Sequence, residues 1–349
     1  MNKSMIKKLC LFGITVTLLT GCSSSNESSD TTQDSQTTQE EVVQEESTDE
    51  SNGQFVLKHV PVLVEKGYED IVLDSVPERI VCLSTAPVLA LHEMGVDLLM
   101  VPQTTVLEYP EDLTAEVVTA ITAESFDLES IIDADPELVL IPESAMETHG
   151  KVLQDAGIPC YVIATTYGLA DPYGLIKEET KSFTDAFSKT PEQEQIATEL
   201  MERFDALDAK MVDAKERFEG TVFLSTMVTN NMDFYAQQES STLGSVMKAL
   251  GFENAYNDSM GGSNSPVSLE SLVDLQNDLM IFINSTQDPE VSKQSALDAM
   301  AVQSDVWNST KAVQEDKVLY LTTNYWVFGG IQVIDSIDSL IDLLDEVLS

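Results

Sequence analysis

The sequence has 349 residues, enough for two globular lobes, and 43% of them are hydrophobic. Its 18 basic residues stand against 60 acidic ones, which gives a net charge of −42 at pH 7. A chain this acidic repels phosphates, so nucleic acid is excluded as a partner. Direct adhesion of the folded part to an anionic lipid surface is disfavoured for the same reason.

Residues 1–21 have the pattern of a bacterial signal peptide. Three lysines in the first eight residues precede an apolar run at 9–19 that is too short to span a bilayer. The run leads into residues 19–22 (LTGC), which resemble the lipobox of bacterial lipoproteins. The resemblance implies that cleavage leaves Cys22 as the first residue, with a lipid on its sulfur and palmitate among its acyl chains.

Residues 22–53 are predicted to be the lipidated cysteine and a disordered acidic tether. The segment contains nine acidic side chains and no basic one, and only Val42 and Val43 are clearly apolar. It cannot bury enough surface to offset the entropy lost on ordering. We therefore expect a lipid-anchored domain at the outer face of the cytoplasmic membrane, extracellular in a one-membrane cell and otherwise periplasmic.

An internal repeat organises the rest of the chain. Strand-like and helix-like segments alternate from residue 80, which predicts an α/β fold with parallel strands. At an offset of 141 residues, three segments of the first half match three of the second. The matched segments are 81–85 (VCLST) with 222–226 (VFLST), 126–133 (FDLESIID) with 267–274 (VSLESLVD), and 138–141 (LVLI) with 279–282 (LMIF). The repeat predicts two lobes of one design.

A long helical pattern at 190–219 separates the two halves. Thr190 is a good N-cap, Pro191 suits the first helical position, and Gly220 ends the pattern. A second amphipathic pattern covers 331–348. The predicted domains are an N-terminal lobe at 60–171, a linker region with the long helix at 172–219, and a C-terminal lobe at 220–349.

Two cysteines lie within the folded part. Cys82 and Cys160 each occupy an apolar, strand-like run. Two buried free thiols are the favoured interpretation, and a disulfide between strands is the alternative, because spacing alone does not decide pairing.

Several segments in order resemble one protein family. These are 77–84 (PERIVCLS), 126–131 (FDLESI) with 135–140 (DPELVL), and 307–313 (WNSTKAV) with 317–320 (KVLY). The chain is similar to the substrate-binding proteins of ABC importers for iron-siderophore, haem and cobalamin. The resemblance implies an α/β fold of class III periplasmic-binding-protein type, with two lobes of parallel-rich sheet joined by one long rigid helix.

The resemblance also implies a function. The chain would bind an iron- or cobalt-containing chelate as a monomer, without an intrinsic cofactor, and deliver it to an ABC permease and its ATPase. It would not be an enzyme, and the sequence has no Gly-rich phosphate loop or nucleophile elbow. Three scattered histidines argue against a bare-metal receptor, so no metal ligands are assigned.

Glu129 and Glu270 are the candidate residues for permease docking. In the family, a glutamate on each lobe docks against basic pockets of the permease, and these two match by position. They are also equivalent within the internal repeat, so they would lie symmetrically on the two lobes. The alternative is that both are ordinary exposed glutamates at helix starts, stabilised by the helix dipole.

Ligands of parallel sheets bind beyond the carboxyl ends of the strands. That rule nominates the loops 84–88, 102–109, 121–127, 142–150, 165–174, 226–243, 257–268, 284–293 and 322–330. They contain no arginine and one lysine, Lys293. A strongly anionic catecholate or carboxylate siderophore would need arginine clamps. A hydroxamate-like iron chelate is therefore favoured, with haem next and a corrinoid or a non-transport surface sensor as alternatives.

The same loops supply aromatic and amide side chains for an apolar pocket with a polar rim. Haem would also need an axial ligand, for which the loops offer a methionine, a histidine and tyrosines. The candidate ligand-binding residues are Tyr325, Trp326, Tyr235, Tyr167, Gln103, Asn231, Met146 and His149.

Overall fold

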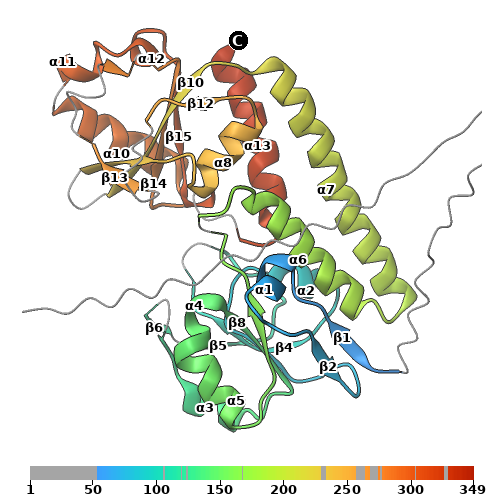
Figure 1. Ribbon diagram of the computed structural model, residues 1–349. Helices are drawn as coiled ribbons and strands as arrows, with labels where there is room; N and C mark the ends of the chain where they lie inside the picture. The colour runs from blue at the N-terminus through green and yellow to red at the C-terminus, as the bar shows by residue number, and fades with distance from the viewer. Residues whose placement is uncertain are drawn as a thin grey trace, which may run out of the picture. The chain divides into compact units, whose positions relative to one another are not determined.

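The computed structural model describes residues 53–104, 107–118, 120–122, 125–166, 168–228, 233–256, 264–267, 274–275, 277–302, 304–325 and 329–349. These residues belong to one compact unit that begins at Ser51. Two separate main sheets, each covered by helices, define an N-terminal and a C-terminal lobe (Figure 1). The predicted α/β class with two lobes of parallel-rich sheet is confirmed.

The N-terminal lobe is built on a five-stranded parallel sheet in the order β5-β4-β3-β8-β9. Its strands are β3 (Ile80–Cys82), β4 (Leu98–Pro102), β5 (Glu116–Val118), β8 (Leu138–Pro142) and β9 (Cys160–Ile163). Successive residues of the central strands are buried in two different core clusters, one on each face of the sheet. Burial on both faces explains why these strands read as continuous apolar runs.

Shorter elements complete this lobe. An antiparallel hairpin of β1 (Phe55–Leu57) and β2 (Ile71–Leu73) encloses α1 (Pro61–Glu65). A second pair of short strands, β6 (Ala120–Thr122) and β7 (Ser125–Phe126), overlaps the predicted loop 121–127. The helices are α2 (Val88–Glu93), α3 (Leu128–Asp133), α4 (Glu143–Ala145), a π-helix at Met146–Gly150 and α5 (Lys151–Asp155).

The C-terminal lobe has a six-stranded mixed sheet, with the path β13-β11-β10-β14-β15 and β12 paired to β10. The strands are β10 (Thr221–Val228), β11 (Asp233–Gln237), β12 (Glu253–Asn254), β13 (Asn264–Pro266), β14 (Leu279–Asn284) and β15 (Val318–Leu321). The helices are α8 (Thr242–Ala249), α10 (Pro289–Ala301), α11 (Ser304–Trp307), α12 (Lys311–Gln314), a 3₁₀ turn at Thr323–Tyr325, and α13 (Gln332–Leu348).

The matched strands of the internal repeat occupy equivalent places in the two sheets. β3 pairs with β8 in parallel, and its counterpart β10 pairs with β14 in parallel. The sheets diverge on the other side of β3 and β10, where the N-terminal lobe adds parallel β4 and the C-terminal lobe adds antiparallel β11. The segment 226–243, expected as a loop, therefore contains the end of β10 and all of β11.

The predicted long helix is α7 (Pro191–Arg217), 27 residues in length. The Thr190 side chain accepts a hydrogen bond from the backbone amide of Gln193 at 3.2 Å, and Pro191 is the first helical residue, as predicted. The preceding helix α6 (Pro172–Phe187) packs against α7, and Tyr173 donates a hydrogen bond to Asp208 of α7 at 2.7 Å.

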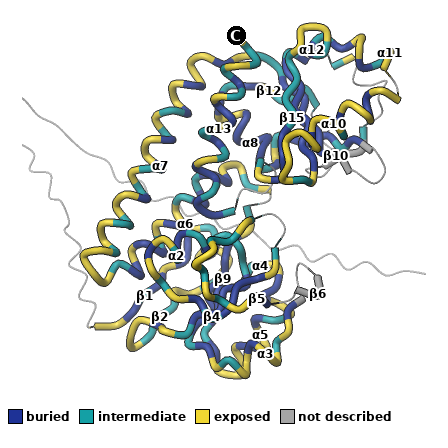
Figure 2. Tube along the Cα trace, turned by 180° about the vertical axis from the view of Figure 1, so that it is seen from behind, coloured by how far each residue is buried: buried dark blue, intermediate teal, exposed yellow. Residues whose placement is uncertain are grey.

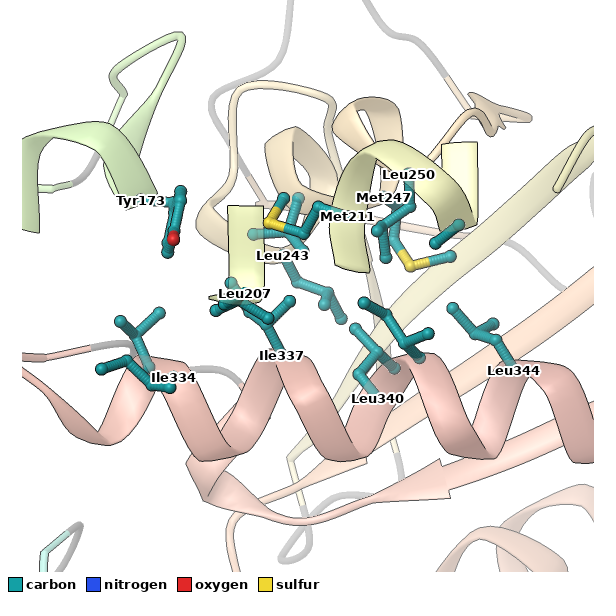
Figure 3. Packing of buried hydrophobic residues seen from close by; sticks show 14 of the residues in the cluster. Tyr173, Leu207, Met211, Leu243, Met247, Leu250, Ile334, Ile337, Leu340 and Leu344 are labelled. Carbon is teal, nitrogen blue, oxygen red and sulfur yellow. The ribbon is translucent and has the colours of Figure 1, made fainter. Parts of the chain in front are cut away.

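Contacts along α7 reach elements of both lobes. Arg203 pairs with Glu93 of α2 at 3.0 Å, and Lys210 pairs with Asp338 of α13 at 2.7 Å. Buried residues of α7 and α8 meet the apolar stripe of α13 in one core cluster, in which Ile337 and Leu340 point toward Leu207, Met211 and Met247 (Figure 3). The exposed side of α7 stands out in Figure 2, where the central strands of both sheets, such as β8 and β14, are buried. The helix is thus fastened along its length.

Candidate functional site

A cavity of about 600 Å³ lies where loops of the two lobes come together. The N-terminal lobe contributes Leu89 in α2, which follows β3, and Leu107 and Glu108, which follow β4. The C-terminal lobe contributes Gln287 after β14, Asn324 after β15, and Gln332, Asp335 and Ser336 from the start of α13. The lining residues thus lie beyond the carboxyl ends of β3, β4, β14 and β15, where ligands of α/β sheets bind.

The lining combines apolar, amide and acidic side chains. Leu89 and Leu107 supply apolar surface, and the other side chains are amides, carboxylates and one hydroxyl. The volume lies within the range of small-molecule sites, which pair apolar walls with a few polar groups. No basic side chain lines the cavity among the residues that the structure describes.

Helix α13 positions its share of the lining by helical periodicity. Its buried stripe, which includes Ile334, Ile337 and Leu340, packs into the core of the C-terminal lobe (Figure 3). Gln332 and Asp335 fall on a different face, three residues apart and therefore neighbours on the helix surface. The packing of one face of α13 thus directs the other toward the cavity.

The two lobes touch backbone to backbone beside this cavity. Gly330 has a φ angle of 66°, and a Cβ atom placed on it would lie 1.8 Å from the carbonyl oxygen of Ala86. Ala86 belongs to the loop between β3 and α2, whereas Gly330 immediately precedes α13. Only glycine combines this backbone conformation with such a close approach.

Of the predicted ligand residues that the structure describes, one lies beside the cavity lining in the chain. Tyr325 follows the lining residue Asn324, is half-buried, and shares a hydrogen bond of 2.9 Å with the hydroxyl of Ser339 in α13. Gln103 lies directly after β4 and is exposed. Tyr235 lies on β11 opposite Thr226 and is half-buried. Their roles in binding stay predictions.

Met146 and His149 lie together in the π-helix after β8. Met146 is buried at 5% exposure in a core cluster of the N-terminal lobe. His149 contacts the ring of Phe126 edge-on and shares a 2.8 Å hydrogen bond with Thr148. Neither residue is part of the cavity lining. The predicted residues Trp326, Tyr167, Asn231, Glu270 and Cys22 lie outside the described part of the chain.

Six polar lining residues are not among those predicted from the sequence: Glu108, Gln287, Asn324, Gln332, Asp335 and Ser336. The first three lie in nominated loops, but nothing in a single sequence ranks them above their neighbours. Asp335 lies within the amphipathic pattern at 331–348, which predicts the helix but not a role for this residue. The signal that could have revealed it is the i, i+3 pairing of Gln332 with Asp335 off the apolar stripe, next to a nominated loop.

A second cavity, of about 520 Å³, lies between the N-terminal lobe and the region where α6 ends and α7 begins. Glu78 lies in its wall just before β3, and Asp97 lies just before β4. The cavity is therefore at the amino ends of the strands, the opposite edge from the usual ligand site. Its position makes it the weaker candidate.

Glu129 occupies the first turn of α3 and is exposed. The N-cap Asp127 accepts hydrogen bonds from the backbone amide and the hydroxyl of Ser130, and these bonds lower the pKa of its carboxyl group. The side chain of Glu129 makes no hydrogen bond or ion pair with any described residue. The local fold therefore presents a carboxylate to solvent without a partner.

The described residues contain no group of three or more histidine, cysteine, aspartate or glutamate side chains that could hold a metal ion. Cys82 and Cys160 are buried and unpaired, and burial raises the pKa of each thiol to about 12. No helix in this part of the chain is both long and apolar enough to cross a bilayer.

The sequence profile of the periplasmic binding protein family matches residues 80–325, which is most of the chain. The chain therefore belongs to this family, whose members are solute-binding proteins and not enzymes. No curated protein matches the sequence.

Three solved structures of similar fold are named for what they bind or transport. The iron uptake substrate-binding protein PiuA of Streptococcus pneumoniae Canada MDR_19A has a TM-score of 0.64 at 18% identity, covering 84% of this chain and 98% of that one. The catecholate-siderophore binding protein VctP of Vibrio cholerae has a TM-score of 0.62 at 16% identity, covering 84% and 99%. The haem-binding protein RhuT of Roseiflexus sp. RS-1 has a TM-score of 0.60 at 17% identity, covering 78% and 100%.

Proposed function

We propose that this protein is the extracytoplasmic receptor of an ABC importer and that its cargo is an iron chelate, most favourably a hydroxamate siderophore. One observation carries the proposal. A cavity of suitable size lies beyond the carboxyl ends of four strands and is lined from both lobes, in a member of the periplasmic binding protein family. The similar structures named for iron, siderophore and haem binding support the same class of cargo.

The positions of the three arginines support a chelate that is not strongly anionic. Arg79 pairs with Asp135, Arg203 with Glu93, and Arg217 with Asp213. None of the three lines the cavity. A catecholate chelate of ferric iron needs cationic clamps of this kind, whereas a hydroxamate chelate is satisfied by amide and hydroxyl partners.

The composition of the lining also favours a siderophore over haem. Haem iron is held by an axial histidine, cysteine, methionine or tyrosine. The cavity-lining residues that the structure describes include none of these four types. The amides Gln287, Asn324 and Gln332 instead offer donors and acceptors for carbonyl and hydroxamate oxygens.

A thermal-unfolding panel tests the cargo. The purified protein is heated alone and with haemin, a ferric hydroxamate, a ferric catecholate or cobalamin. A ligand at 100 times its dissociation constant should add about 2.7 kcal/mol to the free energy of unfolding and raise the midpoint by a few degrees. We expect the hydroxamate to give the shift and the catecholate to give none. A shift with the catecholate alone would contradict the charge argument, and no shift with any ligand would contradict the receptor function.

We further propose attachment through a lipid on Cys22 and the acidic tether that follows it. The tethered domain would bind the permease through Glu129 and through Glu270, the equivalent residue in the internal repeat. The exposure of Glu129 and its lack of a partner among the described residues support this role. An exposed carboxylate of this kind can form charge-assisted hydrogen bonds with arginines of another protein.

Charge reversal at Glu129 tests the docking. We expect Glu129→Lys to reduce cellular uptake of the chelate severalfold while leaving its affinity for the purified protein unchanged, because the change removes a permease contact and touches no cavity residue. Glu192 provides the control, since it is also exposed in the first turn of a helix, α7. Glu192→Lys should leave uptake unchanged. Normal uptake with Glu129→Lys and Glu270→Lys combined would refute the docking role.

A further inference from the structure

Two carboxylates face the cavity from opposite lobes. Glu108 lies in the loop after β4, and Asp335 lies in the first turn of α13. Both are exposed, and neither forms a hydrogen bond or an ion pair with any residue that the structure describes. Two other acids of the same helix do have partners, because Asp338 and Asp342 both bind Lys210 at 2.7 Å. Glu108 and Asp335 are thus unpaired acids that line the cavity from the two lobes.

The distribution of basic residues leaves these two charges uncompensated. Every lysine and arginine from residue 53 onward lies in the part of the chain that the structure describes, so the remaining loops contribute none. Most of them are held in ion pairs with nearby acids, as Lys177 is with Asp205 and Lys311 with Asp278. None lines the cavity. The electrostatic potential within the cavity is therefore negative. No lysine or arginine lines the cavity to neutralise the two carboxylates before a cationic ligand binds them.

The remaining lining suits the rest of such a ligand. Gln287, Asn324 and Gln332 present amide groups, and Leu89 and Leu107 present apolar surface. Amides pair with the oxygens of a neutral chelate, and leucines pack against its methylene chains. A negative field and a neutral polar lining together fit a ligand with a neutral metal centre and a cationic arm.

We propose that the cavity selects chelates that carry a positively charged group, and that Glu108 and Asp335 bind this group, an alkylammonium, from the two sides of the cavity. The proposal rests on the function proposed above and narrows its cargo from iron chelates in general to cationic ones. Glu108 and Asp335 act as specificity-determining residues, and the amides and leucines hold the part that all hydroxamate chelates share.

A matched pair of ligands isolates the charge. Ferrioxamine B is a trishydroxamate ferric chelate with one free ammonium group, and its N-acetyl derivative keeps the same metal centre without that charge. Dissociation constants of both for the full-length protein are measured by quenching of intrinsic fluorescence. We expect ferrioxamine B to bind about fivefold to tenfold more tightly than the acetylated form at low salt. The preference should decrease as the salt concentration rises to 0.5 M, because salt screens exposed charges.

Neutral substitutions assign the effect to the two acids. Glu108→Gln and Asp335→Asn should each reduce the preference about twofold to threefold, and the double variant should abolish it while still binding the acetylated chelate. Glu111→Gln and Glu346→Gln remove one charge each from exposed positions outside the cavity, and they should leave the preference intact. These controls separate a local effect from the loss of net charge.

The outcomes distinguish this proposal from the function on which it rests. Equal binding of the two ferrioxamines by the wild-type protein would overturn the charge selection and leave the receptor function standing. A preference that survives in the double variant would overturn the assignment to Glu108 and Asp335. Failure of both ferrioxamines to bind would overturn the hydroxamate receptor itself, and this inference with it.

Discussion

Replacing Gly330 with alanine is expected to lower the free energy of unfolding by about 3 kcal/mol and to weaken binding of the chelate. The added Cβ atom would lie 1.8 Å from the carbonyl oxygen of Ala86, and the φ angle of 66° is one that alanine rarely adopts. The obstacle is backbone, so no side-chain rotation relieves it. The loop before α13 must therefore move away from the β3–α2 loop. This movement should displace Leu89 and Gln332, which lie close to the contact in the sequence and line the cavity.

Alanine substitutions at two other glycines separate the cost of the positive φ angle from the cost of the close backbone contact. A Cβ at Gly329 would have its nearest neighbour at 3.8 Å, so Gly329→Ala should cost little. Gly95 has a similar φ of 69° with nothing within 4 Å, so Gly95→Ala should show the conformational cost alone, about 1 kcal/mol. Urea unfolding and chelate titration are compared across the three variants. If Gly330→Ala resembles Gly95→Ala in both measurements, the contact between the lobes has no energetic role.

Much of the fold could be predicted because it follows from local signals. The strands β3, β8, β10 and β14 are buried on both faces, so they read as apolar runs, and the repeat identified them as two equivalent pairs. The long helix α7 carries its own start signals in Thr190 and Pro191. These features depend on neighbours in the chain, which a single sequence displays.

The antiparallel strand β11 could not be predicted in the same way. It pairs with β10, which itself runs to Val228. The sequence of this region is rich in asparagine and polar residues, and the repeat predicted that the two lobes would match. A strand whose stability comes from pairing with β10 and β13 gives little local signal, because its hydrogen bonds are made to segments distant in the chain.

The sequence predicted the location of the candidate site better than the residues that line it. The rule for carboxyl ends of strands nominated the loops that contain Glu108, Gln287 and Asn324, and the cavity lies there. Aromatic side chains were chosen within those loops because they dominate small-molecule sites. Tyr325 shows how tertiary contacts intervene, since its hydroxyl is already bonded to Ser339 of α13. Periodicity identified the buried face of α13, but the surroundings of its other face depend on how the lobes pack.

His59 joins the N-terminal hairpin of β1 and β2 to the main sheet, and its two hydrogen bonds require one protonation state of its ring. Its Nε2 atom accepts a hydrogen bond from the backbone amide of Val162 at 3.0 Å, and its Nδ1 atom donates one to the carbonyl oxygen of Glu69 at 2.8 Å. The ring stacks on Tyr161 with centroids 4.2 Å apart. Because Nε2 must be an acceptor, only the neutral imidazole with its proton on Nδ1 satisfies both bonds.

Replacing His59 with phenylalanine should lower the free energy of unfolding by about 3 kcal/mol. Phenylalanine keeps a ring beside Tyr161 but leaves the buried amide of Val162 without an acceptor and the carbonyl of Glu69 without a donor. His59→Gln, whose amide can replace one of these bonds, should cost less. Urea unfolding at pH 7.5 measures both losses. Equal stability of the phenylalanine variant and the wild type would show that the two hydrogen bonds contribute nothing net.

The same geometry predicts how stability depends on pH. Burial lowers the pKa of His59 from its ordinary value of 6.5, while the carbonyl of Glu69 and the charge of Asp70 oppose the shift. The unfolded chain therefore takes up this proton first, so the contribution of His59 is complete above pH 6.5 and is lost as the pH falls through the folded-state pKa. Buried Glu179 acts in the opposite direction, because its pKa is raised to about 8 and its contribution is lost as the pH rises.

The difference in unfolding free energy between the wild type and His59→Gln removes the Glu179 contribution, which both proteins share. This difference should shrink between pH 7.5 and pH 5, as the wild type loses the neutral imidazole. Tyr161→Phe is the control, because it removes the 3.1 Å hydrogen bond to the carbonyl of Lys58 and leaves the imidazole in place. It should lower stability by a similar amount at every pH in this range. A constant difference for His59→Gln would mean that the folded protein accepts the imidazolium as readily as the unfolded chain does. The hairpin would then not be fastened by the acceptor at Nε2.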